Sequence, residues 1–257
     1  MIFYKTREEI EIIRRSADIL GRVHGELAKN IKPGISTLKL DTIAFQLIKD
    51  SKAVPSFKGY DGFPGTLCIS VNNAVVHGLP NDYILKEGDI VSIDCGVFFE
   101  GFHSDSAYTY AVGEISPMAK KLLDVTKESL YLGIAAIKKG SRVGDVAYAV
   151  QNFVESNGFS IVRDLVGHGV GKNLHEEPQV PNYGKRGVGP VLKDGLVIAI
   201  EPMVNVGKRY VVKGKDGWSI LTRDNSLSAH FEHTVAIVDG KPDVLTTFKY
   251  IEEALNG

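Results

Sequence analysis

A ten-residue phrase, LKEGDIVSID, ends at Asp94 and recurs as LKDGLVIAIE, which ends at Glu201, 107 positions later. Four of its positions are identical, and four more exchange like for like, including the closing carboxylate. A second pair, IKPGISTLKLDTIAFQLIKDS from Ile31 and IKKGSRVGDVAYAVQNFVES from Ile137, has nearly the same offset. Two matches at one offset argue against the alternative, a common turn-then-strand pattern met twice by chance. The chain is therefore predicted to be duplicated, each half running helix, glycine turn, helix and strands.

The repeat predicts the fold class. No Pro/Ser-rich linker separates the two halves, so residues 1–257 are predicted to form a single α+β domain with internal pseudo-two-fold symmetry. Asp94 and Glu201 should then face each other near the symmetry axis. Three helix boundaries are also predicted: a third helix with Ser116 as N-cap and Pro117 as its first residue, running to about Gly140, a fourth that ends at Gly158, and a short last helix from about Asp243.

The composition limits the class of protein. With 44% hydrophobic and 24% charged residues, the sequence is typical of a soluble globular protein. The net charge of −1 and the absence of long Lys/Arg runs give no indication of nucleic acid or an anionic membrane as a partner. The N-terminus is too charged for a secretory signal, and no apolar stretch is long enough to cross a bilayer. The two cysteines have no CxxC spacing, so we expect a cytoplasmic enzyme or binding protein.

Two acids fall on one face of a predicted hairpin. Glu100-Gly101 is a credible two-residue turn, which pairs Gly96 with Asp105 across the strands. Side chains alternate along a strand, so Asp94 shares a face with Gly96. Asp94 and Asp105 should then be diagonal neighbours, about 7–8 Å apart at the backbone, with Gly96 leaving room between them.

Two further acids, Glu201 and Glu232, lie at strand boundaries and bring the number to four. Four buried carboxylates need counter-charges, and no Lys or Arg lies near them in these strand segments. The alternative is that each acid is a solvated strand end. A divalent metal would neutralise all four acids and is the interpretation that covers them together.

Histidines in glycine-bearing segments supply nitrogen donors: His77, His168 and His175. Three others flank the acids and are expected to support them or to lie at the surface: His103, His230 and His233. Four carboxylates with one imidazole suit two divalent ions of Mn, Fe, Co or Zn. Two such ions, about 3.5–4 Å apart, can share a hydroxide and polarise a carbonyl group. The predicted chemistry is hydrolysis.

Over essentially its whole length the sequence resembles the type I methionine aminopeptidases, whose pita-bread fold is shared with prolidases and creatinase. The resemblance rests on VNNAVVHGLP, IDCGVFFEGFHSDSA, GHGVGKNLHEEPQVPNY, IEPMV and DGWSILTRDNSLSAHFEHTV. It implies five metal ligands, among which Asp105 and Glu232 bridge two ions. Asp94 would complete one ion site, and His168 and Glu201 the other.

The resemblance also implies a reaction, in which a metal-bridging hydroxide removes the N-terminal methionine of nascent proteins and peptides, preferring a small second residue. His175 would stabilise the developing oxyanion, and His77 would position the peptide nitrogen beyond the scissile bond. Glu201 resembles the residue that passes a proton to the leaving amine. The partners would be nascent-chain N-termini, with transient ribosome association, and the protein would be a monomer.

An apolar slot for the methionine side chain is implied at Tyr60, Phe63, Cys68 and Trp218. Two more positions, Phe57 and Leu174, line the slot in the family, although relatives carry Cys and Phe there. Two other functions remain open: an aminopeptidase P or prolidase-like hydrolase, and a non-catalytic binding protein of this fold. The whole-chain motifs and the absence of a separate N-terminal domain speak against the first, and the intact ligand set against the second.

Overall fold

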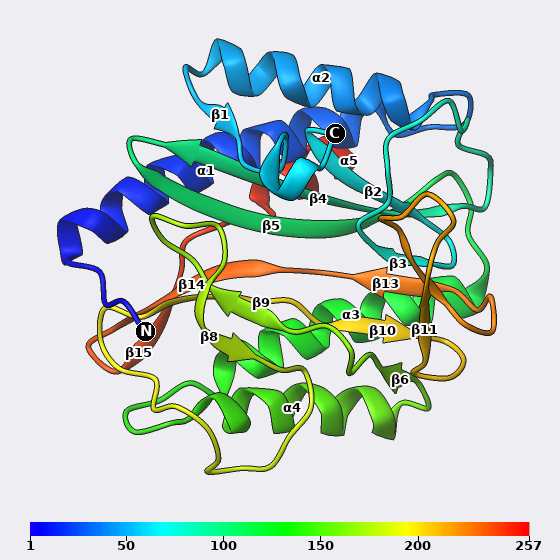
Figure 1. Ribbon diagram of the computed structural model, residues 1–257. Helices are drawn as coiled ribbons and strands as arrows, with labels where there is room; N and C mark the ends of the chain where they lie inside the picture. The colour runs from blue at the N-terminus through cyan, green and yellow to red at the C-terminus, as the bar shows by residue number, and fades with distance from the viewer. Residues whose placement is uncertain (257) are drawn as a thin grey trace.

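Two helix-covered sets of antiparallel strands make up the computed structural model, which describes residues 1–256 (Figure 1). In the first half, helices α1 and α2 cover one side of the strands; in the second half, α3 and α4 do so. The helices are α1 (Arg7–Asn30), α2 (Thr37–Asp50), α3 (Pro117–Ala135), α4 (Val143–Ser156) and α5 (Lys249–Asn256). No helix among the described residues is long and apolar enough to cross a membrane.

A long hairpin organises the first half. It consists of β4 (Ile90–Phe99) and β5 (Phe102–Ala111), and β4 also pairs with β1 (Val54–Pro55) and β2 (Leu67–Val71). The predicted turn is confirmed, because Glu100 and Gly101 both have positive φ angles, 47° and 89°, as a two-residue hairpin turn of this kind requires. The predicted register is confirmed as well, with Gly96 opposite Asp105.

The second half is built around a five-stranded sheet in the order β15-β14-β9-β7-β8. Its strands are β7 (Gly167–Gly169), β8 (Glu176–Val180), β9 (Val197–Ile200), β14 (His233–Val238) and β15 (Lys241–Val244). Two smaller sheets complete the fold, in the orders β13-β10-β6 and β11-β12-β3. They comprise β3 (Ala74–Val76), β6 (Ser160–Ile161), β10 (Met203–Asn205), β11 (Val211–Lys213), β12 (Ile220–Thr222) and β13 (Ser228–His230).

The sequence repeat is a structural repeat. Helices α2 and α4 are both 14 residues long and occupy equivalent places in the two halves. Each follows a turn whose glycine has positive φ, 96° at Gly34 and 86° at Gly140. Equivalent backbone hydrogen bonds link these turns to the repeated segments that begin at Leu85 and Leu192. The Leu85 N–H donates to the Ile35 carbonyl, and the Leu192 N–H donates to the Ser141 carbonyl, both at 2.8 Å. The predicted α+β architecture with internal symmetry is confirmed.

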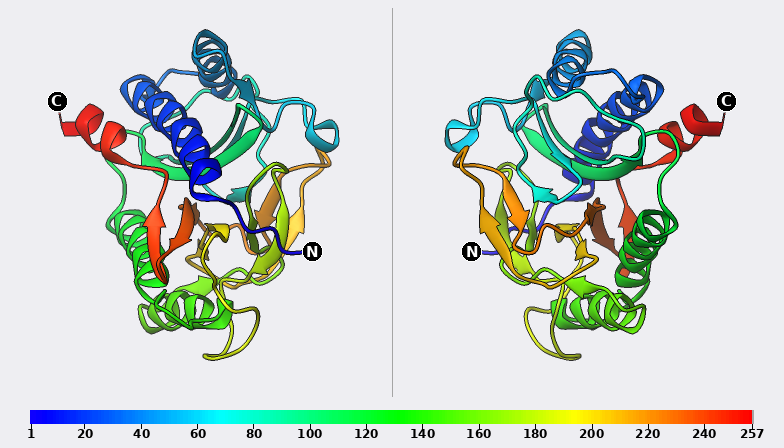
Figure 2. Two further views of the ribbon diagram at one scale, coloured as in Figure 1. Left: turned by 90° about the vertical axis from the view of Figure 1, so that its left-hand side faces the viewer. Right: turned by 90° about the vertical axis from the view of Figure 1, so that its right-hand side faces the viewer.

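Strands β5 and β14 join the halves. The Thr234 hydroxyl accepts the Asp105 N–H at 3.0 Å and donates to the Asp105 carbonyl at 2.7 Å. The last helix crosses back to the first half, where α5 packs along α1 (Figure 2). Gly21 leaves space for the ring of Tyr250, and Gly25 for its Cβ and backbone. A Cβ at Gly25 would lie 2.7 Å from the Tyr250 Cβ.

Three boundary predictions were wrong. The third helix ends at Ala135, five residues before Gly140, which instead occupies the turn that precedes α4. The fourth helix ends at Ser156 rather than Gly158. At the C-terminus, residues 241–244 form β15, because they pair with β14, and the helix begins only at Lys249.

Candidate metal centre

The β4–β5 hairpin brings the first two acids together. Asp94 stands opposite Ala107, and Asp105 stands opposite Gly96, so both carboxylates leave the same face of the sheet. The structural reason for a glycine at position 96 differs from the predicted one. A Cβ there would lie 2.7 Å from the Ser56 Cβ and 2.8 Å from the ring of Phe57, so the glycine makes room for the pocket wall rather than for the acids.

Strand β7 presents His168. Gly167 and Gly169 flank it, and a Cβ on either glycine would collide with the backbone of a neighbouring strand. His168 Nδ1 lies 2.9 Å from the Gly169 carbonyl oxygen, which fits an N–H donated from Nδ1 and turns Nε2 towards the acids. Nε2 is 3.6 Å from Glu201 Oε1 and 3.9 Å from Asp105 Oδ2.

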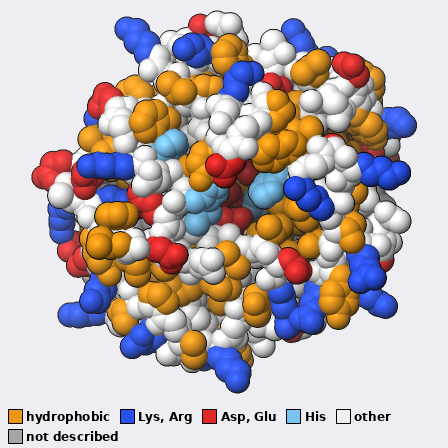
Figure 3. Space-filling model, viewed as in Figure 1, with side chains coloured by type: hydrophobic (Ala, Val, Ile, Leu, Met, Phe, Trp, Pro, Cys, Tyr) orange, Lys and Arg blue, Asp and Glu red, His pale blue; other side chains and the backbone are white. Residues whose placement is uncertain are grey.

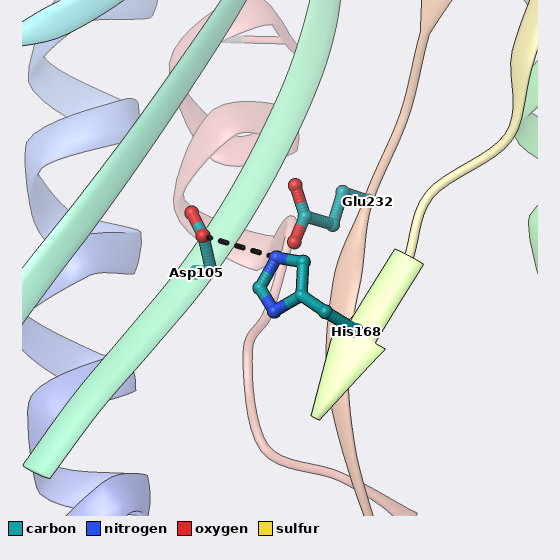
Figure 4. Close-up of side chains that lie close together, drawn as sticks. All are labelled: Asp105, His168 and Glu232. Atoms are coloured by element: carbon teal, nitrogen blue, oxygen red, sulfur yellow. Dashed lines mark ion pairs between the residues drawn. The ribbon is translucent and has the colours of Figure 1, made fainter. Parts of the chain in front are cut away.

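Glu201 and Glu232 complete the cluster from the second half. Glu201 directly follows β9, and the Asn182 side-chain amide holds its carbonyl oxygen at 2.9 Å. Glu232 lies between β13 and β14, where its N–H donates to the Ala107 carbonyl at 2.9 Å. Asp105, His168 and Glu232 each offer one ligand atom, and these three atoms lie within 4.8 Å of one another. Figure 4 shows the three side chains close together. The structure thus gathers the acids from both halves of the chain.

The four carboxylates of this cluster are buried close together, so their negative charges need a positive counter-charge. Burial raises the pKa of Asp94 to about 7 and raises the pKa values of the other three acids well above their ordinary range. The charges of neighbouring acids raise the pKa values of Asp105, Glu201 and Glu232 further. Within residues 1–256, no Lys or Arg forms an ion pair with any of the four.

Buried carboxylate oxygens without hydrogen-bond partners indicate whether these residues could bind a metal ion. One carboxylate oxygen on each of Asp94, Asp105 and Glu232 is buried and has no hydrogen-bond partner in the described part of the chain. Burial also lowers the pKa of His168 to about 3, which leaves its imidazole neutral, as a ligand must be. Carboxylate oxygens with a neutral imidazole are a donor set for divalent ions such as Mn, Fe, Co or Zn. The residues present therefore fit such ions.

His77 and His175 border the same cavity without joining the acid cluster. His77 has a φ of 59°, and it is held there by Gly78, whose carbonyl accepts the Ile69 N–H at 2.8 Å. His175 Nδ1 lies 2.8 Å from the Tyr60 hydroxyl, and its ring meets the ring of His168 edge-on at 4.3 Å. Burial lowers the pKa of both His77 and His175, so both favour the neutral form.

The cavity has a volume of about 600 Å³ and opens at the centre of the face in Figure 3, where histidine and acidic side chains gather. The predicted slot residues form one wall of it: a buried cluster of Phe57, Phe63, Cys68 and Leu174, with Trp218 packed against it. The Trp218 and Phe63 rings meet edge-on at 5.2 Å. Tyr60 lies at the cavity's margin, 38% exposed. All the predicted site residues therefore line one cavity.

Sequence reasoning missed one ion pair beneath the site. Lys5 Nζ lies 2.6 Å from Glu176 Oε2, and the two side chains are only 3% and 2% exposed. Glu176 follows His175 directly and lines the cavity. The two partners are 171 residues apart in the sequence, so no local pattern could have indicated the contact.

Comparison with known proteins assigns the chain. The sequence pattern of metallopeptidase family M24 matches residues 11–239. The chain belongs to this family. The chain is 53% identical to methionine aminopeptidase 1 of Bacillus subtilis, over 96% of its own length and 99% of that protein's length. It is 43% identical to the methionine aminopeptidase of Escherichia coli, over 96% of its length and 95% of that protein's.

Solved structures of related proteins have the same fold as this chain. The methionine aminopeptidase of Thermotoga maritima superposes with a TM-score of 0.94 at 46% identity, covering 96% of this chain and all of that one. The prolidase of Pyrococcus furiosus superposes with a TM-score of 0.76 at 25% identity, covering 95% of this chain but 65% of that one. The predicted family and its pita-bread fold are thus confirmed, and metal use follows from membership in a metallopeptidase family.

Proposed function

We propose that the protein is a methionine aminopeptidase, which hydrolyses the peptide bond after an N-terminal methionine and prefers a small second residue. One observation carries the proposal: acids from both halves of the chain meet beside an apolar wall of the same cavity. The relatives that carry this name cover almost the whole chain, which supports the same activity here.

We propose Asp94, Asp105, His168, Glu201 and Glu232 as the ligands of two divalent ions. The ions could be Co, Mn, Fe or Zn, since each accepts oxygen ligands with a single nitrogen. Divalent ions in such a site activate water and polarise the scissile carbonyl group. The two positive charges of each ion would offset the mutual repulsion of the four carboxylates.

His175 is proposed to donate to the substrate carbonyl oxygen. If the Tyr60 hydroxyl donates to Nδ1, the proton of the neutral imidazole sits on Nε2, which then donates into the cavity. A donor aimed at the oxygen where negative charge develops stabilises the transition state. His77, which lines the same cavity, is proposed to position the peptide nitrogen beyond the scissile bond.

Glu201 is proposed to carry a proton to the leaving amine in addition to binding metal. The methionine side chain would lie against Phe57, Phe63 and Trp218, because a thioether packs favourably on aromatic rings. Cys68 and Leu174 would close the base of this slot, and Tyr60 its rim. We further propose that residues 1–257 form a single catalytic domain that acts as a monomer in the cytoplasm, on nascent N-termini and with transient ribosome association.

Release of methionine from Met-Gly-Met-Met tests the proposal, with an X-Pro peptide as the substrate of the competing prolidase-like activity. Chelation should abolish methionine release, and Mn²⁺ or Co²⁺ should restore it. Glu201→Gln should lower kcat at least about 100-fold with the circular dichroism spectrum unchanged. Cleavage of the X-Pro peptide in preference to the methionine peptide would refute the assignment, and full activity after exhaustive chelation would refute the metal.

A further inference from the structure

His230 ends β13 with its imidazole buried behind the carboxylates of the metal centre. Its Nε2 lies 3.8 Å from Glu201 Oε2 and 3.9 Å from Glu232 Oε2. The side chain is 2% exposed, and neither ring nitrogen has a hydrogen-bond partner among residues 1–256. A buried polar atom without a partner destabilises the folded state. Among residues 1–256, the charged groups that lie within 4 Å of this ring are the two carboxylates.

The other two histidines that flank the acids point elsewhere. His233 Nδ1 lies 2.7 Å from the Thr246 hydroxyl, and its Nε2 lies 3.4 Å from the Tyr131 hydroxyl. His103 Nδ1 lies 2.8 Å from the Ser56 hydroxyl. Of these three side chains, therefore, only that of His230 faces the metal centre.

His168 and His230 lie next to different carboxylate oxygens of Glu201. His168 Nε2 is 3.6 Å from Oε1, whereas His230 Nε2 is 3.8 Å from Oε2. A carboxylate that gives Oε1 to an ion beside His168 keeps Oε2 free to accept an N–H. The backbone of His230 is fixed, because the Thr109 hydroxyl donates to its carbonyl at 2.7 Å and accepts its N–H at 2.9 Å.

We propose that His230 is a positioning residue of the metal centre, whose Nε2–H donates to the carboxylates of Glu201 and Glu232 and fixes their orientation towards the ions. This inference rests on the proposed function. The separations of 3.8 and 3.9 Å exceed a hydrogen bond by less than about 1 Å, so a small rotation of either carboxylate closes the contact. Donors of this kind behind metal ligands change metal affinity by about 10–100-fold.

Two variants and one control test the proposal. His230→Leu removes both nitrogens while keeping an apolar side chain in the buried space, and His230→Gln keeps an amide that can donate. His233→Leu is the matched control, since that ring is equally buried, three residues away, and faces Thr246 and Tyr131. Binding of Mn²⁺ to the stripped proteins is measured by titration calorimetry, together with their thermal unfolding in chelator.

His230→Leu is expected to weaken Mn²⁺ binding about 10–100-fold, whereas His230→Gln recovers most of the affinity and His233→Leu binds as the wild type does. In chelator, His230→Leu should unfold at or above the wild-type temperature, because it removes unpartnered polar atoms. This combination separates a positioning role from a loss of packing.

Three outcomes overturn the proposal: unchanged Mn²⁺ affinity in His230→Leu, equal weakening in His230→Gln and His230→Leu, or equal weakening in His233→Leu. The second would make the imidazole a direct ligand, and the third would trace the effect to packing. Failure of the proposed function is distinguishable, because it would appear in the wild type as absent Mn²⁺ binding or absent methionine release.

Discussion

Breaking the buried ion pair between Lys5 and Glu176 should destabilise the protein more than any exposed pair can. The side chains are 3% and 2% exposed and 2.6 Å apart. Within residues 1–256, each charged group makes one other hydrogen bond: Lys5 Nζ donates to the Phe3 carbonyl at 3.3 Å, and Glu176 Oε1 accepts the Asn173 N–H at 3.1 Å. Removing either partner therefore leaves the other as a buried charge with a single hydrogen bond.

The expected cost of Lys5→Met or of Glu176→Gln alone is about 3–5 kcal/mol. At roughly 2–4 °C per kcal/mol for a chain of this size, Tm should fall by about 6–20 °C. The double variant leaves no charge buried and should recover much of this loss, with a coupling energy of at least about 2 kcal/mol. Lys5 also donates its backbone N–H to the Gly195 carbonyl, a bond that all three variants keep.

Urea unfolding in chelator, followed by circular dichroism, gives the four free energies of this cycle. The pair Arg7–Asp239 is the control, at a similar 2.8 Å but with side chains 73% and 70% exposed. The cycle of Arg7→Met and Asp239→Asn should show a coupling energy below about 1 kcal/mol. The reasoning is refuted if Lys5→Met costs less than about 1 kcal/mol, or if the two pairs show equal coupling energies.

Three further predictions concern the core, the turn at His77 and the slot. Burial lowers the pKa of His24 to about 4 in the folded state, below its ordinary 6.5, so stability is full above pH 6.5 and falls by up to about 3 kcal/mol as the pH drops to 4. Urea unfolding across that range should show the loss, and His24→Gln should flatten it. A Cβ at Gly78 would collide with the Ile69 carbonyl oxygen, so Gly78→Ala should lower both Tm and kcat, whereas Gly101→Asn, in open space at a φ of 89°, should cost only backbone strain and leave kcat unchanged. Trp218→Ala should lower kcat/KM for methionine peptides about 10–100-fold through lost apolar contact, and an unchanged value would place the slot elsewhere.

The parts of the site that the sequence predicted are those fixed by short-range rules. The Glu100-Gly101 turn determines the register of β4 and β5, and the register determines that Asp94 and Asp105 share a face. The repeat then relates Glu201 to Asp94 without any knowledge of the distance between them. The slot residues came from family resemblance, since neither spacing nor periodicity indicates them.

The parts that the sequence did not predict depend on partners far along the chain. Residues 241–244 became a strand because β14 offered a free edge, and not because of their own propensity. Gly96 was assigned to the acids, although Ser56 and Phe57 are what it accommodates. The orientation of His230 towards the carboxylates depends in the same way on where β13 crosses β5, which no local pattern specifies.

The crossing of α5 back onto α1 has a consequence for assembly. The chain ends by packing its last helix on the first half, so a cut between β5 and α3 would leave the first fragment without a cover over Gly21 and Gly25. The acids are divided in the same way, with Asp94 and Asp105 in one fragment and Glu201 and Glu232 in the other. Metal binding would then report that the two fragments have found each other, which makes complementation of separately expressed halves a readout of completed folding.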